Sequence, residues 1–319
     1  MRVLVTGARS LLGAAVVEQL SARGDDVTAF QRHPSTTGVK EILGDIRDAN
    51  AVNRAAEGQD AIVHLAALVA PRPRWVDAYD VNVMGTGHIL EAATRVGRLV
   101  HVSTPSVAFE NVPAAGVGAE RARYDGRDAY ARSKALAETM VLERMTVPTV
   151  ILRPHLVWGP GDTQLVGRIV QRARQGRLVL PNGGKALVDT TYVDDAAAAL
   201  VAGLDRTGEN SEACGKPWVV SGNDPRTLRE LVEGILNASR VTSKIRSLPI
   251  PVVDVLARGV GRFWPGDEPP LTYFAARQLS VAHWFDQRAT QVALQWRPQV
   301  GVDEGMERLA RWNARQIDC

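Results

Sequence analysis

Cysteines, long apolar runs and blocks of like charge are all scarce in this sequence. The two cysteines, Cys214 and Cys319, form neither a C-x-x-C pair nor a zinc-ligand spacing, so we expect neither a disulfide framework nor a metal site. Nowhere do about 18 apolar residues follow one another without a charge, which argues against a membrane-spanning helix. The first residues lack a signal-type basic and apolar segment. A reducing cytoplasm is therefore the expected compartment.

Neither sign of charge dominates. Lys and Arg number 38 against 35 Asp and Glu, for a net charge of +3, and no basic block offers a nucleic-acid arm, so we expect no nucleic-acid partner. Hydrophobic residues make up 45% and charged residues 23%, as in an ordinary globular protein. A chain of 319 residues is long for a single core, so we expect a large domain with a smaller lobe.

Short runs of Val, Leu and Ile alternate with amphipathic stretches through the first half of the chain. The runs have the composition of buried parallel strands, and the stretches are long enough for crossover helices. The alternation predicts an α/β fold, a doubly wound parallel sheet of the Rossmann type. The expected strands are Val3 to Val5, Val27 to Phe30, Ala61 to Leu65, Leu99 to Val102 and Val147 to Leu152, and the expected helices are 11–23, 47–57, 76–96 and 128–145.

The alternation loosens after a Gly- and Pro-rich turn that ends at Asp162. We expect residues 1–162 and about 187–224 to form an NADP-binding Rossmann domain. A smaller, mostly helical substrate-binding lobe would take about 163–186 and 225–319.

Two segments within these later regions suggest helices. Asp224-Pro225 predicts the N-cap and first turn of a helix. The stretch from Leu248 to Trp264 is amphipathic, which favours a packing helix, with a lid, a subunit interface or a membrane-surface element as alternatives.

The first expected strand runs into a loop with glycines at positions 7 and 13. This spacing is typical of a T-G-x-x-G-x-x-G loop, whose backbone N–H groups and helix dipole face a pyrophosphate. Gly7 permits the tight turn, and Gly13 lets the helix pack closely on the sheet. Ser10 replaces the middle glycine, and its Cβ narrows the approach of the phosphates. The loop predicts a nicotinamide dinucleotide held by Gly7, Arg9, Ser10, Leu11, Leu12 and Gly13.

The second expected strand ends in Phe30-Gln31-Arg32-His33, which contains no carboxylate. NAD enzymes normally place an acid there to accept the ribose 2′-hydroxyl. Arg32, together with Arg9, would instead pair with a 2′-phosphate. The sequence therefore favours NADP(H) over NAD(H), and the alternative is that Arg32 is a solvated surface residue.

Tyr130 and Lys134 lie four residues apart in an expected helix, which places the phenol and the ammonium on one face. They follow a buried strand that ends in Ser103-Thr104, at the edge where doubly wound folds bind ligands. Reducing a carbonyl requires a proton donor for its oxygen, and a phenol with a pKa of about 10 is a weak one at neutral pH. Lys134 and an oxidised nicotinamide would lower that pKa. The pattern predicts a reductase.

Further motifs extend this pattern, and together they resemble the extended short-chain dehydrogenase/reductase superfamily, in its epimerase/dehydratase-like branch. The resemblance covers essentially the whole chain. It is strongest to 3β-hydroxysteroid dehydrogenase-like and 2-alkyl-3-oxoalkanoate reductase-like members. The motifs are Gly44-Asp45-Ile46, His64-Leu65-Ala66-Ala67, Asp80 to Thr86, Arg153 to Asp162 and Thr191 to Asp195.

The resemblance implies a role for each matching residue. Around the cofactor, Asp45 and Ile46 would contact the adenine, Leu65, Ala66 and Ala67 would flank the adenosine and ribose, and Pro154 and His155 would meet the nicotinamide.

In the catalytic group that the resemblance implies, Thr104 rather than Ser103 supplies the hydroxyl that binds the substrate oxygen. Tyr130 protonates that oxygen, and Lys134 holds the ribose. Asn82 supports them, or alternatively only bridges helices. We also expect a homodimer.

The resemblance leaves three functions open. A ketone reductase acting on a hydrophobic, sterol-like or β-keto acid substrate leads, because Pro105-Ser106 replaces the Asp-Glu pair of dehydratases. A sugar-nucleotide epimerase or reductase would need a diphosphate clamp, with Arg229 or Arg277 as candidates. A non-catalytic NADP-binding redox sensor is the third.

Overall fold

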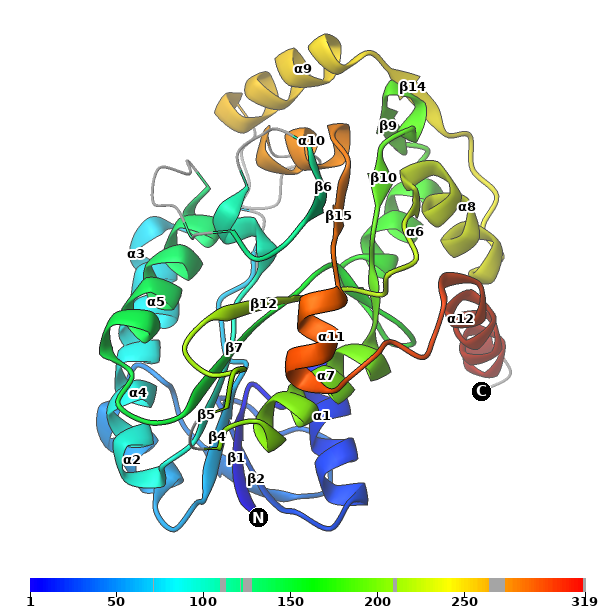
Figure 1. The fold of residues 1–319 in the computed structure, drawn as a ribbon. Helices are drawn as coiled ribbons and strands as arrows, with labels where there is room; N and C mark the ends of the chain where they lie inside the picture. The colour runs from blue at the N-terminus through cyan, green and yellow to red at the C-terminus, as the bar shows by residue number, and fades with distance from the viewer. Residues whose placement is uncertain are drawn as a thin grey trace.

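Seven parallel strands form the central sheet of the computed structural model, which describes residues 1–70, 72–109, 113–120, 122, 128–208, 211–263 and 273–317 (Figure 1). The sheet confirms the predicted doubly wound α/β fold. Its strands lie in the order β12-β7-β5-β4-β1-β2-β3. Their bounds are β1 Arg2–Thr6, β2 Asp26–Gln31, β3 Lys40–Leu43, β4 Ala61–His64, β5 Leu99–Val102, β7 Thr149–Pro154 and β12 Pro217–Val220.

Helices cover both faces of this sheet, which explains why its inner strands are apolar on both faces rather than alternating. In β1, for example, Val3 and Val5 face one core while Leu4 faces the other, and all three are fully buried. The first face carries α1 (Leu11–Ala22), α7 (Val193–Asp205) and α11 (Arg288–Leu294); the second carries α2 (Ala49–Ala56), α4 (Gly85–Val96) and α5 (Ala129–Arg144).

The strand order reverses at β1, with β2 and β3 on one side of it and β4, β5 and β7 on the other. In such sheets ligands bind in the crevice above the carboxyl ends of the strands at the reversal. Thr6 ends β1 and pairs with His64, which ends β4. The crevice therefore opens directly above these two residues.

The remaining elements gather beyond the carboxyl edge of the sheet and along one side of it (Figure 1). They include a second sheet of order β13-β10-β15-β6 and two strand pairs, so short strands accompany the expected helices. The predicted division between domain and lobe stays a prediction. The bounds are β6 Ala114–Val117, β8 Val157–Trp158, β9 Val179–Pro181, β10 Leu187–Val188, β11 Thr191–Tyr192, β13 Arg226–Thr227, β14 Arg246–Leu248, β15 His283–Phe285, α6 Val166–Arg174, α8 Leu228–Ala238, α9 Ile250–Phe263, α10 Tyr273–Ser280 and α12 Val302–Ile317.

The expected helix cap at Asp224-Pro225 is wrong. Helix α8 begins three residues later, at Leu228, behind a capping box in which the Thr227 side chain accepts from the Glu230 backbone and the Glu230 carboxylate accepts from the Thr227 N–H. Asp224 instead accepts from the backbone N–H of Val302 at 3.0 Å and so ties the start of α12 to this turn.

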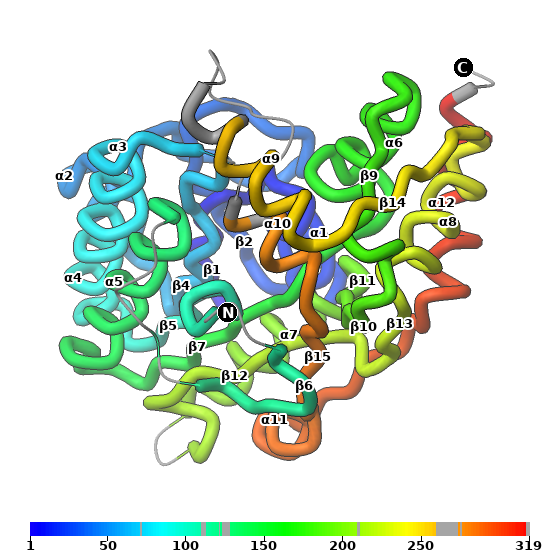
Figure 2. The backbone as a smooth tube through the Cα atoms, turned by 90° about the horizontal axis from the view of Figure 1, so that it is seen from above, coloured from blue at the N-terminus to red at the C-terminus, as the bar shows by residue number. Residues whose placement is uncertain are grey.

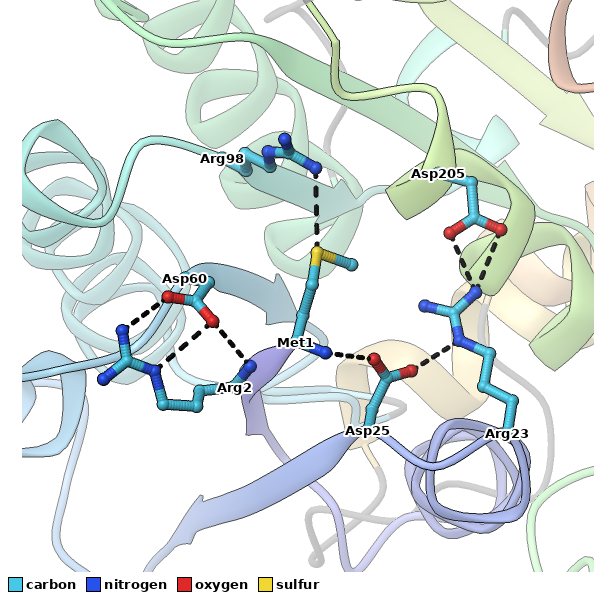
Figure 3. Close-up of polar contacts among 7 residues, drawn as sticks. All are labelled: Met1, Arg2, Arg23, Asp25, Asp60, Arg98 and Asp205. Carbon is cyan, nitrogen blue, oxygen red and sulfur yellow. Dashed lines mark hydrogen bonds and ion pairs between the residues drawn. The ribbon is translucent and has the colours of Figure 1, made fainter.

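Ion pairs join the elements at the opposite, amino-terminal edge of the sheet (Figure 3). The Met1 ammonium lies 2.7 Å from Asp25, which also pairs with Arg23 at the end of α1. Arg23 reaches Asp205 at the end of α7 over 2.8 Å. These partly exposed pairs contribute little stability individually, and they lie far from the ligand edge.

Candidate active site

The glycine loop after β1 forms a close-packed turn. A Cβ on Gly7, whose φ is +74°, would lie 2.9 Å from the Ala66 nitrogen, and a Cβ on Gly13 would lie 2.3 Å from the Gly7 oxygen. The tight turn predicted at Gly7 therefore requires glycine at this position. Gly13 lies in the first turn of α1 and packs against the loop's own backbone. These positions exclude any side chain, which leaves backbone N–H groups at the start of α1 for a pyrophosphate.

Ser10 occupies the position of the missing middle glycine and caps α1. Its hydroxyl donates to the Gly7 carbonyl at 2.9 Å and accepts from the Gly13 N–H at 3.0 Å. The side chain is thereby turned back into the loop. Leu11 and Leu12 follow it and are partly buried.

The residues expected around the adenosine lie at neighbouring strand ends. The Ala66 N–H donates to the Thr6 hydroxyl at 3.1 Å, which joins the Leu65–Ala67 segment to the strand leading into the loop. Asp45 pairs with Arg47 at 2.7 Å, and this hydrogen bond lowers the pKa of Asp45, with a smaller contribution from the nearby Arg32. Arg32 therefore lies beside the predicted adenine turn.

The end of β2 holds a carboxylate that sequence reasoning missed. Glu41 of β3 accepts from the Gln31 amide at 2.9 Å and from the Ser35 N–H at 3.0 Å. Arg9 and Arg32 are exposed and form no ion pair with any described residue. Both cations are thus available at this edge, where Glu41 accepts from neutral donors and Asp45 is paired with Arg47.

Helix α5 carries the predicted tyrosine and lysine, and its first turn is capped by Asp128, which accepts from the Ala131 N–H at 2.9 Å. The Lys134 ammonium is 3% exposed and donates to the Val102 carbonyl at 2.7 Å. Burial lowers the pKa of Lys134 to about 8, and the Glu138 carboxylate partly opposes this. The helix is thereby anchored to the end of β5.

Burial raises the pKa of Tyr130 to about 12, and a hydrogen bond with Thr104 acts in the opposite direction. Asp128 raises it further. Thr104 and Tyr130 are therefore brought together as predicted. The Ser103 hydroxyl is buried without a hydrogen bond to any described residue, so Thr104 is the hydroxyl that reaches the phenol. Any lowering of this pKa would have to come from the nicotinamide cation, because burial dominates among the protein's own groups.

Asn82 lies in a π-helical turn, Asp80–Met84, between α3 (Trp75–Tyr79) and α4. Such insertions are frequent at functional sites. The buried Asn82 amide accepts from the Leu68 N–H at 2.7 Å and donates to the Ser133 hydroxyl at 2.9 Å. Ser133 in turn donates to the Tyr130 carbonyl at 2.9 Å. Asn82 thus supports the catalytic helix through Ser133, a residue that the sequence motifs did not indicate.

His64 extends this network to the glycine loop. Its Nδ1 lies 2.8 Å from the Thr6 hydroxyl and its Nε2 lies 3.1 Å from the Thr86 hydroxyl. Thr86 donates to the Asn82 carbonyl at 2.7 Å, so it accepts from a His64 that is protonated on Nε2. Burial lowers the pKa of His64 to about 3, which keeps the ring neutral.

The predicted nicotinamide residues lie at the end of β7 and just beyond it. Pro154 ends the strand, and His155 is buried behind it with Nε2 2.8 Å from Nδ1 of His283 in β15. The next residue, Leu156, has a φ of +41°, an uncommon conformation for a side chain of this size.

The described residues offer no cluster of His, Cys, Asp and Glu that could hold a metal. Across the same residues, no helix has both the length and the apolarity to cross a membrane.

These observations assemble a dinucleotide cradle and a Tyr-Lys-Thr group at one edge of a doubly wound sheet. A family model described as the NAD dependent epimerase/dehydratase family matches residues 3–214. The chain belongs to this family. That assignment confirms the resemblance predicted from the motifs, and it makes an NAD-type dinucleotide the ligand that the Gly7 and Gly13 cradle fits.

Individual members of the epimerase/dehydratase family align along nearly the whole chain. A 2-alkyl-3-oxoalkanoate reductase of Stenotrophomonas maltophilia is 38% identical over 97% of this chain and 98% of its own length. A protein of the same name from Shewanella oneidensis is 34% identical over 96% and 84%. A 3beta-hydroxysteroid-dehydrogenase/decarboxylase of Arabidopsis thaliana is 30% identical over 85% of this chain and 51% of its own.

Solved structures confirm the fold of the family. A short-chain dehydrogenase/reductase superfamily protein from Agrobacterium tumefaciens with bound NAD superposes with a TM-score of 0.77 at 22% identity, covering 99% of this chain and 98% of its own. MoeE5 in complex with UDP-glucose and NAD gives 0.76 at 24% identity, covering 99% and 100%.

Proposed function

We propose that the protein is an NADP(H)-dependent oxidoreductase that interconverts a ketone and a secondary alcohol on a hydrophobic substrate, with a long-chain 3-oxo acid as the leading substrate. The observation that carries this proposal is the hydrogen bond between Tyr130 and Thr104, on the helix that carries the buried Lys134 one turn further along. Two relatives named as 2-alkyl-3-oxoalkanoate reductases, aligned over 97% and 96% of this chain, support the substrate class.

The chemistry divides between cofactor and protein. A bound reduced nicotinamide supplies the hydride that reaches the carbonyl carbon. Tyr130 donates its phenolic proton to the carbonyl oxygen, and Thr104 holds that oxygen by a hydrogen bond. Lys134, one turn further along α5, would hold the nicotinamide ribose, so that the positive charge of the oxidised ring favours the tyrosinate that remains. In the reverse direction the tyrosinate takes the proton back from the alcohol.

Preference for NADP(H) is part of the proposal. Arg32 and Arg9 are exposed and without ion-pair partners among the described residues, and charge-assisted bonds to a 2′-phosphate would satisfy both. Glu41, the acid closest to this site in the β-sheet, accepts hydrogen bonds from Gln31 and Ser35. These bonds hold one of its two carboxylate oxygens, Oε1, among neutral donors of the protein.

Sugar-nucleotide chemistry is less well supported, because the two arginines that would clamp a diphosphate are engaged elsewhere. Arg229 donates to the Gly183 carbonyl at 2.8 Å and pairs with Glu233 at 3.0 Å. Arg277 pairs with Asp254 at 3.1 Å. Freeing either side chain for a ligand would cost these bonds. The similarity to sugar-nucleotide enzymes of known structure, at 24% identity, extends to the fold alone.

The proposal is tested with purified protein, NADPH and a panel of carbonyl compounds, by following the loss of NADPH absorbance. The panel contains long-chain 3-oxo acids, a 3-keto sterol and a UDP-linked 4-keto sugar. We expect consumption with the hydrophobic ketones. Turnover of the sugar nucleotide alone would overturn the substrate class, and tight NADP⁺ binding without any turnover would favour a redox sensor. The expected homodimer and cytoplasmic location stay predictions.

A further inference from the structure

The glycine loop and the catalytic helix α5 belong to separate elements, and a buried network of hydrogen bonds joins them. Strands β1 and β4 carry the loop side of this network, and the turn around Asn82 with helix α4 carries the other side, next to α5 (Figure 2). None of the side chains in the network is more than 1% exposed, and they are Thr6, His64, Thr86, Asn82 and Ser133.

The donors in the first part of this network all point the same way along it. The Ala66 N–H donates to the Thr6 hydroxyl at 3.1 Å, and Thr6 donates to Nδ1 of His64 at 2.8 Å. Nε2–H of His64 donates to the Thr86 hydroxyl at 3.1 Å, and Thr86 donates to the Asn82 carbonyl at 2.7 Å. A neutral imidazole protonated on Nε2 therefore satisfies both hydroxyls, because one of its nitrogens accepts and the other donates.

The loop end of the network is closely packed. A Cβ on Gly7 would lie 2.9 Å from the Ala66 nitrogen, so the loop and Ala66 are in direct contact. Ala66 is bonded to Thr6, and Thr6 is bonded to His64. A dinucleotide bound at the glycine loop would therefore have a fixed position relative to His64.

The other end of the network meets α5 one residue before Lys134. The Asn82 amide donates to the Ser133 hydroxyl at 2.9 Å, and Ser133 donates to the Tyr130 carbonyl at 2.9 Å. Tyr130 and Lys134 lie on either side of Ser133 in the same part of the helix. These bonds therefore fix the turn that carries both catalytic side chains.

We propose that His64 is a positioning residue that holds this turn of α5 in place relative to the dinucleotide loop. Its ring bonds to Thr6 at the end of β1 and to Thr86 in α4, so it joins the two halves of the network. Alignment of this kind matters for rate, because a misplacement of about 1 Å at a reacting centre can cost about 100-fold. The inference rests on the proposed function, in which Tyr130 is the proton donor.

The first test compares His64→Leu with His64→Gln. Leucine loses both bonds of the ring, whereas glutamine keeps one donor and one acceptor. We expect kcat for a 3-oxo acid to fall about 10-fold in His64→Leu and less than about 3-fold in His64→Gln, because alignment is lost only in the first. Both variants should bind one NADP⁺ per chain with a dissociation constant within about 3-fold of the wild type, which excludes unfolding as the cause of the lower kcat.

A double-variant cycle tests whether His64 acts through Ser133. Among the described residues, Thr86 and Asn82 link the two. Ser133→Ala should lower kcat about 5-fold in the wild type and less than about 2-fold further in His64→Leu, because residues of one network are not independent. Thr86→Val should reproduce the loss seen in His64→Leu. Thr28→Val is the matched control, at a buried threonine of β2 outside the network, and should leave kcat within about 2-fold.

Losses that multiply in the double variant, or an unchanged kcat in His64→Leu, would overturn the inference while leaving the reductase intact. Hydrogen exchange of the α5 amides tests it without turnover. These amides should exchange about 10-fold faster in His64→Leu than in Thr28→Val, and equal rates would also overturn it. A wild type that reduces none of the carbonyl compounds would count against the proposed function instead, and the exchange rates would still decide the role of His64.

Discussion

The Lys134 ammonium donates to the backbone oxygen of Val102 over 2.7 Å, which binds helix α5 to the strand that leads into Thr104. One hydrogen bond thereby fixes two of the three catalytic side chains relative to each other. The ammonium is 3% exposed, so its charge is held against a substantial loss of hydration. The position that Lys134 needs for catalysis therefore lowers the free energy of unfolding of the protein.

The buried ammonium should make stability depend on pH. Burial lowers the pKa of Lys134 from 10.5 to about 8, so between these values the unfolded chain binds more protons than the folded one. The free energy of unfolding therefore rises with pH across this window, by about 3 kcal/mol for this group. Lys134→Met should remove that rise and abolish most activity. The free energy of unfolding in urea, measured at several pH values between 7 and 10, tests the expected rise.

Lys185→Met provides the control for this prediction, since Lys185 is exposed. It should leave both the activity and the pH profile of unfolding as in the wild type. A rise with pH that persists undiminished in Lys134→Met would show that other groups cause it.

Tyr130 should be required as the proton donor. Tyr130→Phe should lower kcat about 100-fold or more while leaving the dissociation constant for NADP⁺ within about 3-fold, because only the reacting proton is lost. Tyr79→Phe, at a partly exposed tyrosine that stacks near Trp75, should have no effect. Because burial raises the pKa of Tyr130 to about 12 and lowers that of Lys134 to about 8, ketone reduction should stay flat between pH 5 and 7, whereas alcohol oxidation should rise with pH. Full turnover by Tyr130→Phe would contradict the mechanism.

Local periodicity made the catalytic helix predictable. Tyr130 and Lys134 are one turn apart, so their shared face follows from helix geometry alone. Five of the seven strands of the central sheet were predicted for a similar reason, whereas the buried, apolar β12 was missed. Strand β3 was also missed. Because it lies at the edge of the sheet, Lys40 and Leu43 are exposed, and Ile42 is the one apolar residue that turns toward the core. Its short pattern does not distinguish a strand from a loop.

The features that the sequence could not predict depend on contacts between distant segments. His155 and His283 are separated by 128 positions, and only the pairing of β15 with β6 and β10 brings the second histidine to the first. The link from Asn82 to Ser133 spans 51 positions across two helices. The π-helical turn at Asp80–Met84 adds a single residue to a helical pattern, which periodicity does not reveal.

Removing one partner of the buried Arg153–Glu138 ion pair should destabilise the fold more than replacing both partners. Both side chains are almost wholly buried, at 1% and 0% exposure. Glu138→Gln should destabilise the protein by about 3–5 kcal/mol, because it leaves the guanidinium without its counter-charge. Replacing both residues, with Arg153→Met and Glu138→Leu, should recover most of that loss. Urea unfolding of the single and double variants measures it, and an additive loss in the double variant would contradict the argument.

The Arg32 side chain should determine the preference for NADPH over NADH. The side chain is exposed beside Asp45, where it contributes to lowering the pKa of that carboxyl. Arg32→Ala should raise KM for NADPH about 10-fold or more and leave KM for NADH unchanged, since a charge-assisted bond is made only to the 2′-phosphate. Arg47→Ala is the matched control, because Arg47 is an exposed arginine that pairs with the same Asp45. Arg47→Ala should raise KM for NADPH and KM for NADH equally, because it disturbs the predicted adenine turn around Asp45. Equal effects of Arg32→Ala on the two cofactors would remove the basis for NADP(H) preference, because the 2′-phosphate is the group that distinguishes NADPH from NADH.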